Sequence, residues 1–167
     1  MKKFFYSLLL LAAAGMTTMA FVSCEEKDET EKIEVKEDYL CFRYWASNDV
    51  LELADITTTG IGALNCTKDA VYMGINGKES NLVEFNGKQA TEASFSVKLK
   101  LKSNWKELLA QKETVDCYCA YSTGSTKGQG TLDLGLNQKG ATYSRARLGD
   151  KFEDTVSAYI EHLTVNY

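Results

Sequence analysis

The stretch that most constrains the fold is residues 93–102, where apolar and polar side chains alternate for ten residues. The apolar members are Ala93, Phe95, Val97, Leu99 and Leu101, and the polar members are Ser94, Ser96, Lys98, Lys100 and Lys102. Successive side chains of a strand point to opposite faces of a sheet, so this period of two predicts a β-strand with one buried face. We interpret the lysines as a solvated face that discourages pairing with another chain.

Short runs of the same kind, separated by turn residues, follow one another along most of the chain after residue 38. We expect further strands at 39–46, 50–56, 70–75, 81–85, 115–122, 131–136, 141–148 and 156–165, with loops at 57–62 and 124–130. Asn76-Gly77 and Asn86-Gly87 each end one of these strands. Because Asn-Gly readily takes the positive φ angles of a tight turn, we expect two β-hairpins there.

One short helix is expected after the strand at 93–102. Asn104 occupies an N-cap position, and Glu107 follows three residues later, ahead of the apolar residues 108–110. This arrangement is typical of a capping box, in which the two side chains satisfy backbone N–H groups of the first helical turn.

Together these elements predict an all-β fold of about eight to ten strands with one short helix. Residues 116–120 (Asp-Cys-Tyr-Cys-Ala) and 128–132 (Gly-Gln-Gly-Thr-Leu) resemble the last two strands of an immunoglobulin variable-type domain, over about 20 residues. This resemblance implies an immunoglobulin-like β-sandwich. The alternative is an up-and-down β-barrel, because successive hairpins also describe a meander.

Residues 1–23 have the order of a secretory signal peptide. Lys2 and Lys3 form a positive start, 4–15 is an apolar run broken only by Ser7, and small residues follow. The alternative is a retained transmembrane helix, but polar and small residues dilute the second half of the stretch below the roughly 20 apolar residues that a span needs.

The signal ends on Phe21-Val22-Ser23-Cys24, which resembles the lipobox of bacterial lipoproteins. The acidic cluster 25–29 that follows resembles the export signal of Bacteroidota surface lipoproteins. These resemblances imply a lipid on Cys24 and a place in the outer membrane at the cell surface, with a periplasm-facing orientation as the alternative. Ordinary cleavage after Ala20 is the rival, and it would leave an odd fifth cysteine in an exported chain.

We therefore divide the chain into a signal peptide (1–23), a lipidated cysteine with a flexible acidic tether (24–38) and a single β domain (39–167). The domain is nearly neutral, with 14 basic and 15 acidic residues, whereas the tether carries a net charge of −5. Nucleic-acid binders show a concentrated basic face, so none is expected as a partner. The expected partners are the membrane, through the lipid anchor, and a glycan or an envelope protein.

Four cysteines, Cys41, Cys66, Cys117 and Cys119, lie in the predicted domain. Cys117 and Cys119 share a strand face, and their Cα atoms would be nearly 7 Å apart, which disfavours a disulfide between them. Two connectivities remain, 41–117 with 66–119 or 41–119 with 66–117, and the alternative is four buried thiols. No metal site is expected, because Cys-x-Cys on a strand lacks the turn that wraps a metal.

Candidate ligand contacts are Tyr44, Trp45 and Lys127. The aromatic residues of 39–45 fall on both strand faces, so one face could form a sugar-stacking platform while the other enters the core. Lys127 lies in a glycine-rich loop, and loops often carry binding residues. His162 is the only histidine, and nothing places it near a nucleophile. We therefore expect no enzyme and no cofactor, but a binding or interaction module; the alternative is a structural or assembly subunit of a cell-envelope complex.

Overall fold

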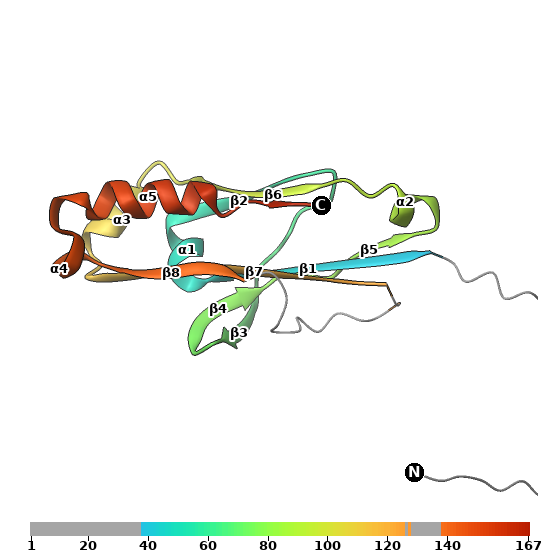
Figure 1. The fold of residues 1–167 in the computed structure, drawn as a ribbon, viewed down its shortest axis with the longest axis horizontal. Helices are drawn as coiled ribbons and strands as arrows, with labels where there is room; N and C mark the ends of the chain where they lie inside the picture. Colours follow the sequence, from blue (N-terminus) through green and yellow to red (C-terminus); the bar gives the residue numbers. More distant parts are fainter. Residues whose placement is uncertain (1–37, 126, 128–137) are drawn as a thin grey trace, which may run out of the picture. The chain divides into compact units, whose positions relative to one another are not determined.

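Strands dominate the part of the chain that the computed structural model describes, which is residues 38–125, 127 and 138–167 (Figure 1). The signal peptide, Cys24 and the tether up to residue 37 fall outside the described residues. So do the predicted strand 131–136 and most of the loop 124–130. The predictions made for those segments therefore stay predictions.

The described residues form a β-rich fold with short helices between the strands. The strands are β1 (Tyr39–Ser47), β2 (Ala54–Thr59), β3 (Lys68–Tyr72), β4 (Ile75–Glu79), β5 (Val83–Asn86), β6 (Ser96–Leu101), β7 (Thr114–Gly124), β8 (Lys139–Ser144) and β9 (Val165–Asn166). The helices are α1 (Asn48–Leu53), α2 (Lys88–Thr91), α3 (Trp105–Ala110), α4 (Arg145–Leu148), the 3-10 turn η1 (Gly149–Lys151) and α5 (Phe152–His162).

The strands form two antiparallel sheets. The large sheet has the order β3-β4-β1-β7-β8, and β5 also pairs with β1; the small sheet has the order β2-β6-β9. In the large sheet β1 lies between β4 and β7, which are distant in sequence. In an up-and-down barrel consecutive strands are neighbours, and this strand order differs from that arrangement. The alternative prediction of an up-and-down barrel is therefore wrong.

Side chains of both sheets and of α1, α3 and α5 form one core. The ribbon shows β2 and β6 in one layer and β1, β7 and β8 in another (Figure 1). On β6, Val97 and Leu99 are buried while Lys98 and Lys100 are exposed, which confirms the predicted alternation. On β1, Phe42 enters the same core, and its ring lies 4.7 Å from the ring of Phe95, just before β6. Burial of these apolar surfaces is the main force that holds the two sheets together.

Helix α5 corrects the predicted strand at 156–165. Its buried residues Phe152, Val156 and Ile160 are four apart and form one helical stripe against the core. The residues Val156, Ala158 and Ile160 also alternate with polar ones, and this coincidence produced the strand prediction. His162 therefore lies in the last helical turn, where its Nδ1 is 2.5 Å from the carbonyl oxygen of Ala158.

Two other predicted strands turn out to be shorter than expected. The predicted strand at 50–56 is α1 followed by β2, and the predicted strand at 141–148 is β8 followed by α4. The predicted helix after residue 104 is confirmed as α3, although the Asn104 side chain makes no capping hydrogen bond. The strands predicted at 39–46 and 115–122 are confirmed as β1 and β7.

The β3–β4 hairpin turns at Met73-Gly74 and not at Asn76-Gly77. Met73 and Gly74 have φ angles of 49° and 80°, the left-handed values that a tight hairpin turn requires. Gly77 instead lies inside β4, opposite Ser47 of β1. Gly87, with φ of 51°, leads from β5 into α2 rather than into a hairpin. Both Asn-Gly hairpin predictions are therefore wrong.

Candidate functional site

A groove of about 550 Å³ opens where β1 begins and β7 ends. The described residues that line it are Asp38, Tyr39, Leu40, Ala90, Thr91, Thr123, Gly124, Ser125 and Tyr167, and we call it the Tyr167 groove. Its volume is within the range of about 300–1,000 Å³ that is usual for small-ligand sites. This groove is the candidate site.

The run of apolar, inward-facing side chains on β7 ends at the groove. On β7, the inward-facing positions 115, 117, 119 and 121 are Val, Cys, Cys and Tyr, and all four contribute to the core. The next inward-facing position is Thr123, which lines the groove instead. Since a strand alternates every two residues, this change from apolar to hydroxyl side chains marks where the sheets stop packing together.

One wall of the groove is an aromatic ring held in a fixed position. The ring of Tyr167 stacks on Phe95 at 4.9 Å and 9°, and Phe95 in turn stacks on Phe85 at 6.0 Å and 11°. The backbones of Tyr167 and Phe95 exchange two hydrogen bonds of 3.0 and 3.1 Å. Tyr167 remains 49% exposed, so this column presents a preorganised aromatic surface to the groove.

The other groups that line the groove are mainly polar. Thr91, Thr123 and Ser125 contribute hydroxyls, which both donate and accept hydrogen bonds. Asp38 is the one charged residue among the described lining residues. Beside it, the neighbouring Glu84 carboxylate and burial raise the pKa of Tyr39 to about 12, so this phenol stays protonated at neutral pH.

The predicted ligand contacts lie elsewhere. Tyr44 and Trp45 are both 0% exposed: Tyr44 packs in the main core, and Trp45 packs under the β3–β4 hairpin, where its Nε1 donates to the carbonyl oxygen of Ala70 at 3.3 Å. Neither can therefore serve as a platform for a surface ligand, because both strand faces of β1 are covered here. Lys127 is exposed, but the residues on either side of it lie outside the described part of the chain.

The register of β1 with β7 excludes both proposed disulfide connectivities. Cys41 pairs with Gly124, and Cys119 pairs with Ala46, five residues farther along β1. This offset separates Cys41 from Cys119 by about 17 Å, and from Cys117 by still more, whereas a disulfide needs Cα atoms within about 7 Å. Cys41 Sγ instead donates to the carbonyl oxygen of Gly124 at 3.4 Å.

The other three cysteines of the domain are thiols in the structure. Burial raises the pKa of Cys66 and of Cys117 to about 12, and that of Cys119 to about 11. Because the thiolate is the reactive form, these side chains behave as small apolar core residues and not as nucleophiles.

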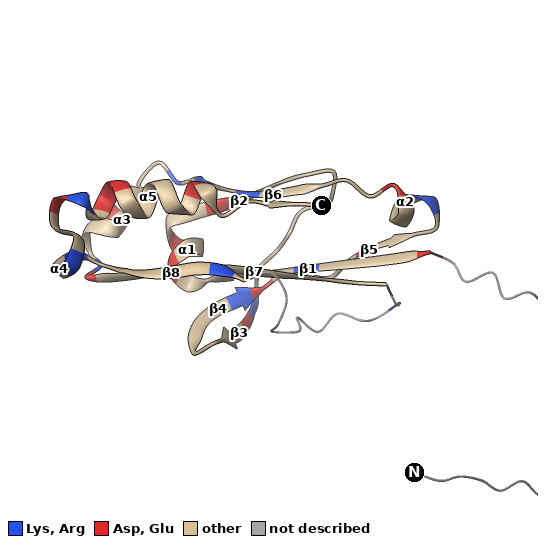
Figure 2. Ribbon diagram, viewed as in Figure 1, with Lys and Arg blue, Asp and Glu red and all other residues tan. Residues whose placement is uncertain are grey.

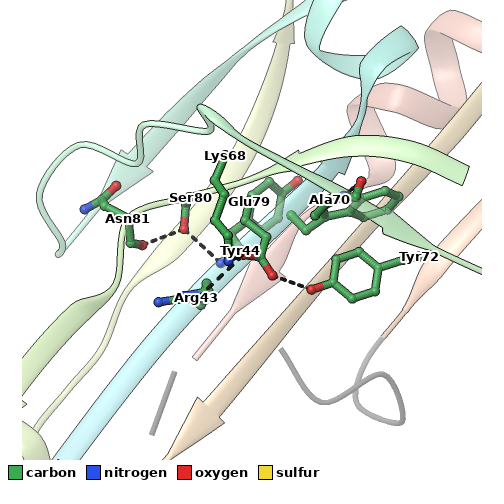
Figure 3. A network of polar contacts seen from close by, with 9 residues as sticks. Arg43, Tyr44, Lys68, Ala70, Tyr72, Glu79, Ser80 and Asn81 are labelled. Carbon is green, nitrogen blue, oxygen red and sulfur yellow. Dashed lines mark hydrogen bonds and ion pairs between the residues drawn. The ribbon is translucent and has the colours of Figure 1, made fainter. Parts of the chain in front are cut away.

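A second polar cluster joins the β3–β4 hairpin to β1 (Figure 3). The Glu79 carboxylate, only 5% exposed as a residue, accepts a hydrogen bond from the Tyr72 hydroxyl and one of 3.0 Å from Lys68 Nζ. Arg43 of β1 adds an ion pair at 3.6 Å. The next residue, Ser80, accepts at its Oγ a hydrogen bond of 3.0 Å from the backbone N–H of Tyr44.

The carboxylate of this cluster is satisfied internally. Burial alone would raise the pKa of Glu79, but the Tyr72 hydroxyl, Lys68 and Arg43 outweigh it, and the pKa lies below its ordinary value. Burial and Glu79 raise the pKa of Tyr72. The contacts that hold this carboxylate ionised come from β3 and β1, so the cluster fastens the hairpin to the sheet.

Other site chemistry does not emerge from the described residues. No three of their His, Cys, Asp and Glu side chains are grouped to hold a metal ion. Lysines, arginines and acids are interspersed along the described elements (Figure 2). Among the helices in that part of the chain, none has the length and apolarity required to cross a membrane.

Comparison of the chain with protein-family models, curated proteins and solved structures found no match. The groove was not predicted from the sequence, since Tyr167 reaches it only through the pairing of β9 with β6. The one local signal was the change to hydroxyl residues at Thr123.

Proposed function

We propose that this chain is an exported lipoprotein whose β-rich domain is a binding module, with the Tyr167 groove as its binding site. The observation that carries this proposal is the exposed, fixed ring of Tyr167 among the hydroxyls of Thr91, Thr123 and Ser125. Fixed aromatic surfaces bordered by a few polar groups are typical of ligand sites, because little conformational entropy is lost on binding.

The experiment that tests the groove is a binding titration with an envelope fraction from cells that lack this protein. Purified full-length chain, labelled with a fluorophore, is compared with Thr91→Arg, which places a long cationic side chain on the exposed rim. We expect saturable binding that Thr91→Arg weakens at least tenfold, about 1.4 kcal/mol.

The matched control is Thr57→Arg on β2. Thr57 is also exposed, and its hydroxyl also donates to a backbone carbonyl, that of Lys98, as Thr91 does to Lys88. Thr57 is not among the residues that line the groove. Equal binding of all three proteins, or a total lack of saturable binding, would remove the groove as the site.

We further propose that the two sheets form a β-sandwich, as the sequence pattern implies. The support is that residues of both sheets share one core, with Phe42 of β1 packed edge-on against Phe95. Long helix α5 lies over part of the same core, so the immunoglobulin-like part of the proposal rests on the sequence resemblance around residues 116–132 alone.

The lipid anchor on Cys24 is supported by the sequence Ser23-Cys24 and the acidic residues after it. We expect wild-type protein to incorporate a metabolically supplied alkyne fatty acid and Cys24→Ala to incorporate none, with Cys66→Ala labelled as wild type. External protease should digest the wild-type domain on intact cells if it faces outward from the outer membrane. Label on Cys24→Ala would contradict the anchor, and protection of the wild type would favour the periplasm-facing orientation.

A second candidate function, a structural or assembly subunit of an envelope complex, is favoured by the β3 edge. β3 ends the large sheet among the described strands, and the hairpin tip exposes Val71 at 60% and Met73 at 74%. Exposed apolar residues beside an open strand edge favour pairing with another polypeptide. If this function holds, Met73→Ser should impair assembly and leave binding at the groove unchanged. If both are impaired, the β3 edge and the Tyr167 groove serve the same function.

A further inference from the structure

We propose that the ligand of the Tyr167 groove is a neutral carbohydrate, with one sugar ring stacked on the free face of Tyr167. This inference rests on the binding function proposed above and names the ligand class for the same site. It follows from three features of the groove: the aromatic surface, the hydroxyls around it, and the charge of the lining.

The aromatic surface is suited to one flat C–H face. The other side of the Tyr167 ring is already covered by Phe95, and Phe42 makes a T-shaped contact with Phe95 from the core. The negative face of an aromatic ring attracts the weakly positive C–H groups that a pyranose presents on its flatter side. Because the ring is already held in place before the ligand binds, little conformational entropy of the Tyr167 side chain is lost on binding.

The hydroxyls supply the polar half of the recognition. Thr123 and Ser125 can each donate and accept, Thr91 can accept, and the Asp38 carboxylate can accept from two neighbouring hydroxyls. Thr91 already donates to the carbonyl oxygen of Lys88 at 3.0 Å, which leaves its oxygen lone pairs for a ligand donor. A ligand rich in hydroxyls and poor in charge matches this set.

The charge of the lining argues against the other common ligand classes. No lysine or arginine is among the described residues that line the groove, and Asp38 is acidic, so a phosphate, a sulfate or an acidic sugar would find no counter-charge among these residues. The described lining includes just two aliphatic side chains, Leu40 and Ala90, too few to bury an acyl chain.

The test is affinity electrophoresis of the purified full-length chain in gels that contain one polysaccharide each. The neutral probes are xyloglucan, galactomannan, arabinoxylan, glycogen and yeast mannan, and the acidic probes are polygalacturonate and heparin. We expect at least one neutral polysaccharide to retard the protein and neither acidic one to do so. Tyr167→Ala should weaken the retardation at least tenfold, whereas Tyr167→Phe, which keeps the stacking face, should change it less than threefold.

The other possible outcomes show whether the ligand class alone or the binding function as well is wrong. Retardation by an acidic probe, or equal retardation of wild type and Tyr167→Ala, would overturn the carbohydrate stack. If no neutral probe retards the protein while Thr91→Arg still weakens binding to the envelope fraction at least tenfold, the ligand class is wrong and the binding function stands. Where Tyr167→Ala lowers the melting temperature, Thr91→Arg, which is outside the core, decides the same question with the retarding polysaccharide.

Discussion

Gly77→Ala is expected to lower the free energy of unfolding by about 3 kcal/mol, at the upper end of the cost of overpacking. An added Cβ at this position would lie 2.5 Å from two ring carbons of Trp45, and closer still to the carbonyl oxygen of Ala46. β4 cannot move away without breaking its pairing with β1, where Gly77 lies opposite Ser47. The measurement is urea unfolding followed by tryptophan fluorescence, since Trp45 is buried beneath this hairpin.

The control for Gly77→Ala is Gly62→Ala. A Cβ at Gly62 would have no atom within 4 Å, and the φ angle there is not in the left-handed region. We therefore expect a change within about 0.5 kcal/mol, as for ordinary surface substitutions. Similar unfolding curves for Gly77→Ala and wild type would show that β4 does not lie this close to Trp45.

The same glycine explains why one hairpin was placed wrongly from the sequence. Asn76-Gly77 has the composition of a tight turn, but Gly77 is required for the close approach of the Trp45 ring, a contact between residues 32 positions apart. Met73-Gly74 takes the turn instead, with the exposed Met73 in a conformation that non-glycine residues seldom adopt. Packing against Trp45, which the local sequence does not reveal, therefore determines which of these two dipeptides forms the turn.

The predictions that succeeded rest on long local periodicity. β6 and β7 each alternate over many residues, so a shift of one residue would bury lysines or expose valines, and the pattern leaves little choice. The strand prediction at 156–165 failed because the short apolar run there fits a period of two and a period of four equally well. Only Phe152, which lies outside the predicted strand, distinguishes the helix from the strand. The fold class was therefore more predictable than the helices.

The candidate site was less predictable still. Tyr44 and Trp45 drew attention because aromatic residues are common in binding sites, yet both are fully buried, one on each face of β1. The exposed aromatic residue of the groove, Tyr167, follows a two-residue strand with no periodic signal of its own. Its position depends on pairing with the chain near Phe95, about 70 residues earlier.

The second large effect is expected from Glu79→Gln, and it should depend on pH. At neutral pH the substitution removes a buried carboxylate that accepts from Tyr72 and Lys68, and charged hydrogen bonds of this kind contribute about 1.5–3 kcal/mol. The folded-state pKa of Glu79 is lowered, so the folded protein binds its proton less readily than the unfolded chain. The stabilisation is therefore complete above the unfolded pKa of about 4.3 and is lost as the pH falls through the lower folded pKa.

Urea unfolding of wild type and Glu79→Gln between pH 7 and pH 3 measures this effect. The difference in unfolding free energy should be about 2 kcal/mol at pH 7 and should shrink as the pH falls below about 4.3, where the unfolded chain binds a proton more readily than the folded carboxylate does. Asp69→Asn is the matched control on the same hairpin, because Asp69 pairs with Lys78 at 2.7 Å but its side chain is 87% exposed. An exposed pair contributes little, so this variant should follow wild type within about 0.5 kcal/mol. A Glu79→Gln difference that stays constant with pH would mean that the carboxylate is not held ionised by Arg43 and Lys68, and that the hairpin is fastened to the sheet by the packing of Trp45 and Tyr72 alone.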